Sequence, residues 1–316
     1  MKIIDLHCDT IDLLEREKSG GDLFKNSFSV DIQKLSQGGS LAQFFALFIN
    51  KNEHKDVKEK CISLMKRFYF EIDSYKDYIA LSRNLEEMYR NKDEGKISAF
   101  LTIEEGAVLE GKMDNLYYFF ENGVRLITLT WNHPNEIGFP SVKDEYMVKG
   151  LTSFGRDLIG EMNRLGMIVD VSHLSDKGFY DVAEISKAPF VASHSNSREL
   201  TPHKRNLTNE MIKILSEKGG VMGINFYNKF LETSGDSYMA KVEDMVRHIK
   251  HIRNIGGIDC IALGTDFDGI GTPVEIEDFS QMDKLIFALE KERFSYGEIE
   301  KICYKNAERV IKDTLK

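Results

Sequence analysis

The chain has 316 residues, of which 42% are hydrophobic and 29% are charged, a composition typical of a globular protein with a sizeable core. Its formal net charge of -9, without any basic run, argues against nucleic acid or an anionic membrane as the main partner. No apolar run approaches the length of a membrane span, and we expect no signal peptide at the N-terminus. Four scattered cysteines form no C-x-x-C pair, which disfavours a disulfide framework or zinc ribbon and favours a reducing, cytoplasmic location.

Apolar segments of strand length alternate with helical patterns along the whole chain. This alternation predicts parallel strands that are covered by helices. The predicted strands are Ile3–His7, Ala42–Ile49, Ile97–Ile103, Val124–Thr130, Met167–Ser172, Phe190–Ser193, Val221–Asn225 and Cys260–Thr265. Eight such strands predict a single (β/α)8 TIM-type barrel over residues 1–316, a length at which these barrels routinely form one domain.

Several segments between the strands carry apolar residues at helical spacing, with residues suited to cap a helix at their ends. The helices predicted in this way are Ser153–Leu165 with a serine in the capping position, Thr208–Glu217 with a threonine cap, Asp244–Ile255 before a glycine pair, and Ser295–Lys312. Their apolar stripes are expected to face the core rather than a ligand.

Two segments do not fit a minimal barrel. The charged stretch Asn50–Lys60 leads into a long helix predicted around Cys61–Tyr75. The segment Asn228–Met239 lacks regular periodicity, and we expect it to form a loop over the face where barrel active sites lie.

Histidines and carboxylates follow several of the predicted strands. They are His7 and Asp9 after the first strand, Glu104 after the third, His173 after the fifth, His194 after the sixth, and Asp266 and Asp268 after the eighth. A single histidine after a strand would more often be a hydrogen-bonded rim residue than a metal ligand. Here three of the chain's eight histidines end strands on the face that holds catalytic groups in barrel enzymes, which predicts a metal centre.

Two metal ions fit these residues better than one. Five candidate ligands exceed the three that a mononuclear zinc site normally takes from the protein. His7 and Asp9 would hold one ion, His173 and His194 the other, and Glu104 would bridge them. Mixed imidazole and carboxylate ligands favour zinc, although manganese or cobalt is chemically acceptable.

Short motifs surround these strand ends. They are Asp5-Leu6-His7-x-Asp9, Ile103-Glu104-x-Gly106, Gly123-Val124-Arg125-Leu126-Ile127-Thr128-Leu129-Thr130, Asp170-Val171-Ser172-His173, Ser193-His194-Ser195 and Gly264-x-Asp266-Phe267-Asp268-Gly269. In this order they resemble the membrane (renal) dipeptidase family, and Asn306-Ala307-x-Arg309-Val310 continues the resemblance into the last helix. The resemblance implies a binuclear zinc dipeptidase of the amidohydrolase type, with a dipeptide as substrate and often a homodimer as assembly.

The resemblance also implies roles for individual residues. The family's metal ligands fall on the five residues named above, its acid/base aspartate on Asp266, its substrate-carboxylate arginine on Arg205 and a pocket tyrosine on Tyr227. A hydroxide shared by the two metals would attack the amide carbonyl, and Asp266 would transfer the proton. Arg205 is suited to its role because a guanidinium binds a carboxylate through two hydrogen bonds. Asp268 is expected to be structural.

The chain departs from the family pattern at two places. The family's Glu-Gly-Gly is Glu104-Glu105-Gly106 here; Glu104 aligns as the bridging residue, and Glu105 is expected to face away. Where the mammalian enzymes have a histidine that contacts the reacting carbonyl, this chain has Trp131. Either His133 reaches the carbonyl or another donor does, which makes His133 and Asn135 candidate substrate contacts.

Two other functions stay open. One is a different amidohydrolase reaction on the same centre, such as hydrolysis of an N-acyl amino acid, a lactam or a lactone, which would not need a free substrate amine. The other is a barrel that binds a ligand or partner without catalysis. The intact set of candidate ligands and the presence of Asp266 argue against that last function.

Overall fold

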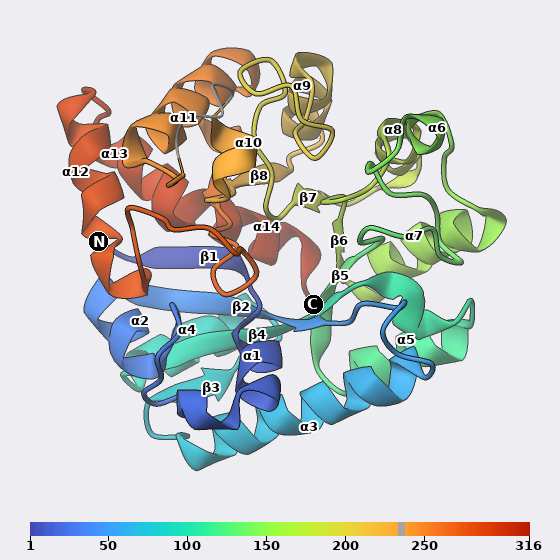
Figure 1. The fold of residues 1–316 in the computed structure, drawn as a ribbon, viewed down its shortest axis with the longest axis horizontal. Coiled ribbons are helices and arrows are strands. Elements are labelled where there is room, and N and C mark those ends of the chain that lie inside the picture. The colour runs from blue at the N-terminus through green and yellow to red at the C-terminus, as the bar shows by residue number, and fades with distance from the viewer. Residues whose placement is uncertain (233–237) are drawn as a thin grey trace.

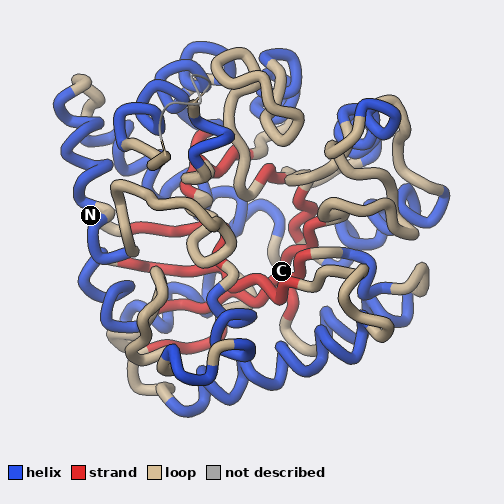
Figure 2. The backbone as a smooth tube through the Cα atoms, in the orientation of Figure 1, coloured by secondary structure: helices blue, strands red, loops and turns tan. Residues whose placement is uncertain are grey.

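The structure is a computed structural model that describes residues 1–232 and 238–316. At its centre a parallel sheet closes into a barrel, and helices surround it (Figures 1 and 2). The sheet closes because β2 pairs with β4 as well as with β1. The barrel strands are β1 (Ile3–Cys8), β2 (Ser40–Phe48), β4 (Ile97–Glu104), β5 (Val124–Thr128), β6 (Ile168–Asp170), β7 (Val191–Ala192), β8 (Val221–Ile224) and β9 (Ile261–Leu263). The predicted (β/α)8 barrel is confirmed.

All eight predicted strands are present, and their ends differ from the predicted ones by at most two residues. One further strand, β3 (Ile79–Leu81), was not predicted. It pairs with the first residues of β4, on the edge that pairs with β5 farther along. With only three residues it extends the sheet at one end and takes no part in closing the barrel.

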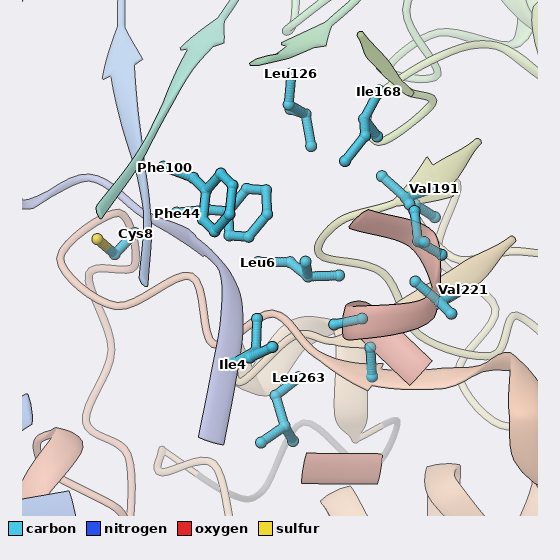
Figure 3. Close-up of a cluster of buried hydrophobic side chains, with 14 of the residues drawn as sticks. Ile4, Leu6, Cys8, Phe44, Phe100, Leu126, Ile168, Val191, Val221 and Leu263 are labelled. Atoms are coloured by element: carbon cyan, nitrogen blue, oxygen red, sulfur yellow. The ribbon is translucent and has the colours of Figure 1, made fainter. Parts of the chain in front are cut away.

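Side chains from all eight barrel strands fill the barrel interior. Figure 3 shows Ile4, Phe44, Phe100, Leu126, Ile168, Val191, Val221 and Leu263 directed toward one another. The rings of Phe44 and Phe100 stack with their centroids 4.6 Å apart. The barrel is therefore a packed core rather than a channel, and a ligand can enter only at its ends.

Two glycines let three strands come close together near the carboxyl end of the barrel. A Cβ atom on Gly223 would lie 2.0 Å from the carbonyl oxygen of Ser193, and one on Gly264 would lie 1.7 Å from the same atom. Any larger residue would push β8 or β9 away from the end of β7. The residue after Ser193 is His194, so these glycines also fix the height of a candidate metal ligand.

Helices cover the outside of the barrel (Figure 1). The α-helices are α1 (Thr10–Arg16), α2 (Ile32–Gly38), α3 (Val57–Ser74), α4 (Leu85–Asp93), α5 (Met113–Glu121), α6 (Asp144–Met147), α7 (Ser153–Leu165), α8 (Asp176–Ile185), α9 (Asn209–Glu217), α10 (Asn228–Leu231), α11 (Val242–Gly256), α12 (Asp283–Lys291), α13 (Tyr296–Glu300) and α14 (Asn306–Thr314). Short 3₁₀ turns are η1 (Lys18–Gly20), η2 (Gly106–Leu109), η3 (Ile258–Cys260) and η4 (Phe279–Gln281), and η5 (Lys301–Lys305) is a π-helical turn. No described helix is both long and apolar enough to cross a membrane.

The helix caps explain most differences from the predicted bounds. α7 has the predicted residues, but Thr152 caps it by accepting a hydrogen bond from the backbone N–H of Gly155, so the prediction of a serine cap was wrong. Thr208 caps α9 as predicted. α3 begins at Val57, earlier than predicted, because the carboxylate of Asp56 caps it; part of the charged stretch is therefore helical.

Two other predicted segments contain more helices and turns than expected. The predicted C-terminal helix is a succession of α13, η5 and α14, with the π-helical turn in the middle. The segment Asn228–Met239, predicted to be a loop, begins with the short helix α10. Its residues 233–237 lie outside the described part of the chain.

Candidate metal centre

Six polar side chains converge at the carboxyl end of the barrel. They are His7 in β1, Asp9 after it, Glu104 at the end of β4, His173 after β6, His194 after β7 and Asp266 after β9. All six are buried or half-buried. The structure thus brings together the five predicted metal ligands and the predicted acid/base residue, although they come from five different strands.

Glu104 lies at the centre of this group. Its Oε2 atom is 3.3 Å from Nε2 of His7, and its Oε1 atom is 3.0 Å from Nε2 of His173 and 3.6 Å from Nε2 of His194. The two oxygens of one carboxylate therefore face the two separate histidine groups. This is the geometry expected of a residue that bridges two ions.

The neighbouring Glu105 belongs to a different network. Its Oε2 atom accepts hydrogen bonds from the backbone N–H of Trp131, at 3.2 Å, and from Nδ2 of Asn135, at 3.0 Å. Burial raises the pKa of Glu105 to about 7, although these donors lower it. Glu105 therefore holds the loop after β5, and Glu104 is the glutamate that faces the cluster.

The cluster contains more acceptor atoms than donors. Oδ2 of Asp9 lies 3.3 Å and Oδ1 of Asp266 lies 3.8 Å from Nε2 of His7. The buried atoms Oδ1 of Asp9 and Oε1 of Glu104 accept no hydrogen bond from any described residue. Buried carboxylate oxygens without donors are costly unless a cation satisfies them. Imidazole nitrogens and carboxylate oxygens at this spacing are a donor set that fits divalent transition metals.

Hydrogen bonds outside the cluster set the orientation of His194. Oγ of Ser193 donates to Oδ2 of Asp170 at 2.6 Å, so its lone pairs face Nδ1 of His194 at 2.8 Å. Nδ1 of His194 must then carry the proton and donate it to Ser193. This tautomer leaves the Nε2 lone pair free toward Glu104, as a metal ligand requires.

His173 is oriented by the same principle. Its Nδ1 atom lies 3.3 Å from Oδ1 of Asn132, while its Nε2 atom lies 3.0 Å from Nε2 of His194 and faces Glu104. Nδ1 donates to the amide oxygen, which leaves Nε2 as the ligand atom. The Nε2 atoms of both histidines therefore point to one place.

The environment lowers the pKa values of two histidines of the cluster in a way that suits metal binding. Burial acts to lower the pKa of His7 as well, but two neighbouring carboxylates outweigh burial and hold it well above its usual value. Burial, together with the nearby Arg205 guanidinium, lowers the pKa of His173 to about 4. Burial also keeps the pKa of His194 well below its usual value, and the imidazole of His7 adds to this shift. Both rings are neutral near pH 7, with lone pairs available to a cation.

The pKa values of two carboxylates in the cluster, Glu104 and Asp266, shift in opposite directions. Burial acts to raise the pKa of Glu104, but His7 and His173 outweigh burial and hold that pKa well below the usual range. Burial raises the pKa of Asp266 to about 7; the charge of His7 opposes this rise, and those of Asp9 and Glu104 add to it. Asp266 is thus a carboxyl group that can both accept and return a proton near neutral pH.

The backbone is strained where two of these side chains enter the cluster. His173 has a φ of 67° and Asp266 a φ of 61°, in the left-handed region that residues other than glycine rarely adopt. Such strain concentrates at functional sites, where it aims side chains. Asp268, with a φ of 70°, accepts hydrogen bonds from Oγ1 of Thr10 and the backbone N–H of Ser29, which agrees with the expected structural role.

A pocket of about 260 Å³ opens onto the cluster. Arg205 also lines this pocket; it is 6% exposed and forms no ion pair within the described residues. Its guanidinium donates to Oγ of Ser195 at 3.3 Å and to the carbonyl oxygen of His194 at 3.1 Å, while Nε has no partner in the described part of the chain. Tyr227 lines the same pocket, and its ring packs against that of Phe230. The Arg205 guanidinium lies over the Phe230 ring, 5.3 Å from its centroid.

The structure does not bring His133 and Asn135 to this pocket. The imidazole of His133 contacts Nδ2 of Asn52 at 3.0 Å and does not line the pocket. The side chain of Asn135 organises its own loop: its amide donates to Glu105, and its oxygen accepts from the backbone N–H of Ile137. Neither side chain lines the described pocket, so the structure gives no support to their predicted contact with the substrate.

Sequence reasoning missed several residues that shape the site. Asn225 donates from Nδ2 to Oδ2 of Asp266 at 2.8 Å, and Ser193 and Asn132 orient the two histidines. Asp12 and Arg16, which form an ion pair at 2.6 Å, line the pocket from α1. Asn225 and Ser193 are the last residues of two predicted strands, so the rule that selected the histidines could have found them too.

Comparison with known proteins agrees with this geometry. The family model described as membrane dipeptidase (peptidase family M19) matches residues 1–316. An uncharacterised dipeptidase of Schizosaccharomyces pombe is 32% identical to this chain, and the match covers 99% of this chain and 80% of that protein.

Two solved structures have the same fold over their whole length. A structure titled as the dipeptidase AC, a family M19 metallopeptidase, has a TM-score of 0.91 at 26% identity and covers 100% of this chain and 99% of its own. A metallopeptidase from Rhodobacter sphaeroides, bound to a phosphinate mimic of L-Ala-D-Ala, has a TM-score of 0.91 at 25% identity and covers 99% of both chains. The chain therefore belongs to the membrane dipeptidase family, peptidase family M19, and is a metal-dependent dipeptidase.

Proposed function

We propose that this protein hydrolyses dipeptides that carry a free C-terminal carboxylate, and that it does so at a centre of two divalent metal ions. The observation that carries the substrate class is the Arg205 guanidinium: it is buried, has no ion pair within the described chain, and shares a pocket with the cluster. A buried cation of this kind calls for an anionic ligand, and a carboxylate matches its planar donors. The small volume of the pocket supports a substrate as short as a dipeptide.

The two ions would be held by two overlapping groups of side chains. His7 and Asp9 form one group and His173 and His194 the other, and Glu104 belongs to both. The mixture of nitrogen and oxygen ligands favours zinc, with manganese or cobalt as alternatives. Bound there, the ions would supply a Lewis acid and lower the pKa of water, so that a nucleophile is available at neutral pH.

The protein's own residues account for the proton transfers. As a water oxygen bonds to the amide carbon, the carbonyl π electrons move to the carbonyl oxygen and the water proton goes to Asp266. Asp266 then donates that proton to the amide nitrogen as the carbon–nitrogen bond breaks and the C=O bond re-forms, which releases an amine and a carboxylic acid. The acid then loses its proton to the amine, which leaves as an ammonium group beside a carboxylate. The pKa of Asp266, raised by burial to about 7, supports both steps. Arg205 meanwhile fixes the C-terminal carboxylate of the substrate.

The test is a panel of alanyl dipeptides, L,L and L,D, each offered as the free acid, the C-terminal amide and the N-acetylated form, with zinc or manganese. We expect the free acids to be hydrolysed and the amides to have a much higher KM. Arg205→Ala should raise KM for the free acids by about 10–100-fold, the effect of losing hydrogen bonds to a charged group, and should hardly change KM for the amides. Arg205→Lys, which keeps the charge but not the two parallel donors, is the matched control and should lie between.

Several results would contradict this proposal. Equal hydrolysis of free acids and amides by the wild-type protein would remove the role of the carboxylate. Hydrolysis of N-acetylated amino acids but not of free dipeptides would favour the other amidohydrolase reactions. Metal analysis should find close to two equivalents of a transition metal per chain, and a folded protein that binds none would exclude the metal centre.

A further inference from the structure

The loop that follows β5 brings an amide side chain to the edge of the metal cluster. Asn132 is half-buried, lines the pocket, and places its Oδ1 atom 3.3 Å from Nδ1 of His173. The role inferred below rests on the proposed dipeptide hydrolysis, and it concerns the oxygen atom of the substrate carbonyl.

The direction of this hydrogen bond leaves the donors of Asn132 free. Since Nε2 of His173 faces Glu104 and carries the lone pair, Nδ1 carries the proton and Oδ1 of Asn132 accepts it. The Nδ2 amide of Asn132 makes no hydrogen bond to any residue in 1–232 or 238–316. Its two N–H groups remain available to a ligand in the pocket.

The loop holds this amide in place through buried hydrogen bonds. The backbone N–H of Trp131 donates to Glu105, and the side chain of Asn135 donates both to Glu105 and to the carbonyl oxygen of Leu129, at 2.9 Å. The residues on either side of Asn132 are therefore anchored to the end of the barrel. A donor fixed in this way costs little reorganisation when charge develops on the substrate.

Two other neutral side-chain donors that are not candidate ligands line the pocket, Trp131 and Tyr227, and neither forms a side-chain hydrogen bond with a cluster residue in the described part of the chain. The Trp131 ring packs edge-on against Phe48, with 6.3 Å between its centroid and that of His173. Tyr227 packs against Phe230 on the side of Arg205. Asn132 is the donor whose carboxamide directly contacts a candidate metal ligand.

We propose that Asn132 donates a hydrogen bond from Nδ2 to the carbonyl oxygen of the scissile amide, and holds that oxygen as it becomes negatively charged in the tetrahedral intermediate. No atom is transferred in this contact. The C=O π electrons move to the carbonyl oxygen, and the side-chain N–H of Asn132 stabilises the negative charge there. The contact strengthens as the charge grows, so it accelerates the reaction more than it tightens substrate binding. Asn132 then supplies the carbonyl contact that neither Trp131 nor His133 makes.

The experiment must separate this contact from the orientation of His173. Asn132→Asp keeps an oxygen for the Nδ1–H of His173 but has no N–H donor, and Asn132→Ala lacks both without adding a charge. His133→Ala, one residue away and outside the pocket, is the matched control. Each variant is measured for kcat and KM on a dipeptide, for metal content, and by calorimetry for binding of a phosphinate dipeptide mimic, whose tetrahedral phosphorus resembles the intermediate.

We expect both Asn132 variants to lose about 10²-fold in kcat, with two equivalents of metal retained and KM nearly unchanged. Their affinity for the phosphinate should fall by a similar factor, because the analogue presents the same anionic oxygen. The His133 variant should match the wild-type protein in all four measurements.

Three results would overturn the proposal. An Asn132→Asp variant with kcat within about threefold of wild type would show that only the bond to His173 matters. Losses confined to KM, or equal losses in His133→Ala, would place the carbonyl contact elsewhere. Phosphinate binding needs no turnover, so it tests Asn132 even if the wild-type protein hydrolysed none of the dipeptides and the proposed function failed.

Discussion

The two sides of the pocket carry unpaired groups of opposite charge. On the cluster side, buried oxygens of Asp9 and Glu104 have no donor among the described residues. On the binding side, the Arg205 guanidinium is buried, and its Nε has no acceptor within residues 1–232 and 238–316. Because a buried charge is costly unless it is paired, each side is complementary to a ligand of the opposite sign. The difference supports the proposal that cations bind on the cluster side and that the carboxylate of the substrate binds on the binding side.

The largest expected effect comes from replacing Asp266, a residue of the cluster side that is not among the five predicted metal ligands. Asp266→Asn keeps the size of the side chain and removes its ability to accept a proton. We expect kcat to fall by about 10²–10⁴-fold, the usual contribution of general acid–base catalysis. Metal content should stay near that of the wild type, because both ligand groups around Glu104 are intact.

Steady-state kinetics and metal analysis on the same preparation check this prediction. A rise in KM with unchanged kcat would place Asp266 on the binding side. The division of the pocket into a cluster side and a binding side would then be wrong. Loss of metal from the variant would instead make Asp266 a ligand, in line with its 3.8 Å distance from Nε2 of His7.

A smaller effect is expected where the backbone packs against the cluster. A Cβ atom on Gly269 would lie 2.1 Å from Oδ2 of Asp9 and 2.7 Å from Oδ1 of Asp266, so both carboxylates would have to move. We expect Gly269→Ala to weaken metal binding by about 10–100-fold, as changes to groups that orient ligands usually do. Competition with a chelator measures this affinity.

Gly271→Ala is the matched control for Gly269→Ala. It lies two residues away, and a Cβ there would meet no atom within 4 Å. Its metal affinity should equal that of the wild type. At saturating metal, Gly269→Ala should bind the substrate with a normal KM; a raised KM would show that the two sides are not independent.

The cluster side could be predicted from the sequence because its residues lie within a few positions of recognisable strands. His7, Glu104 and His194 follow apolar runs, and parallel strands in a barrel bring their carboxyl ends to one face. What could not be predicted is which nitrogen of each histidine carries the proton and which one faces the cluster. The tautomer of His173 depends on Asn132, which is distant in the chain, and that of His194 on the Ser193 hydroxyl, which the distant Asp170 directs; no spacing rule gives these contacts.

The binding side was harder to predict because loops form it. Arg205 lies in the long connection between β7 and α9, which Asn206 shapes by donating to the carbonyl oxygens of Thr201 and Phe230. Such contacts have no periodicity, so only the family resemblance indicated Arg205. The position of His133 was hard to predict for the same reason: Glu105 holds the loop after β5, and Asn132 rather than His133 lines the pocket.

The last prediction tests whether acid acts separately on the binding side. His248 in α11 is buried; its Nδ1 accepts from the backbone N–H of Ser197 at 3.1 Å, and its Nε2–H donates to the carbonyl oxygen of Leu231 at 3.0 Å. It thus links the loop that carries Arg205 to the end of α10. Both nitrogens are satisfied only in the neutral ring, because a proton on Nδ1 would face the N–H of Ser197.

Burial lowers the pKa of His248 to about 4 in the folded protein, against about 6.5 in an unfolded chain. The unfolded chain therefore binds a proton before the folded one as pH falls, so the stability that His248 contributes is complete above pH 6.5 and is lost toward pH 4. The loss should approach about 3 kcal/mol over this range. His248→Gln, which can donate and accept without titrating, should flatten the pH dependence of urea unfolding by that amount. His251→Gln, on the next turn of α11, should leave the dependence unchanged. If both variants behave alike, the acid sensitivity lies in the cluster histidines, and the binding side has no pH dependence of its own.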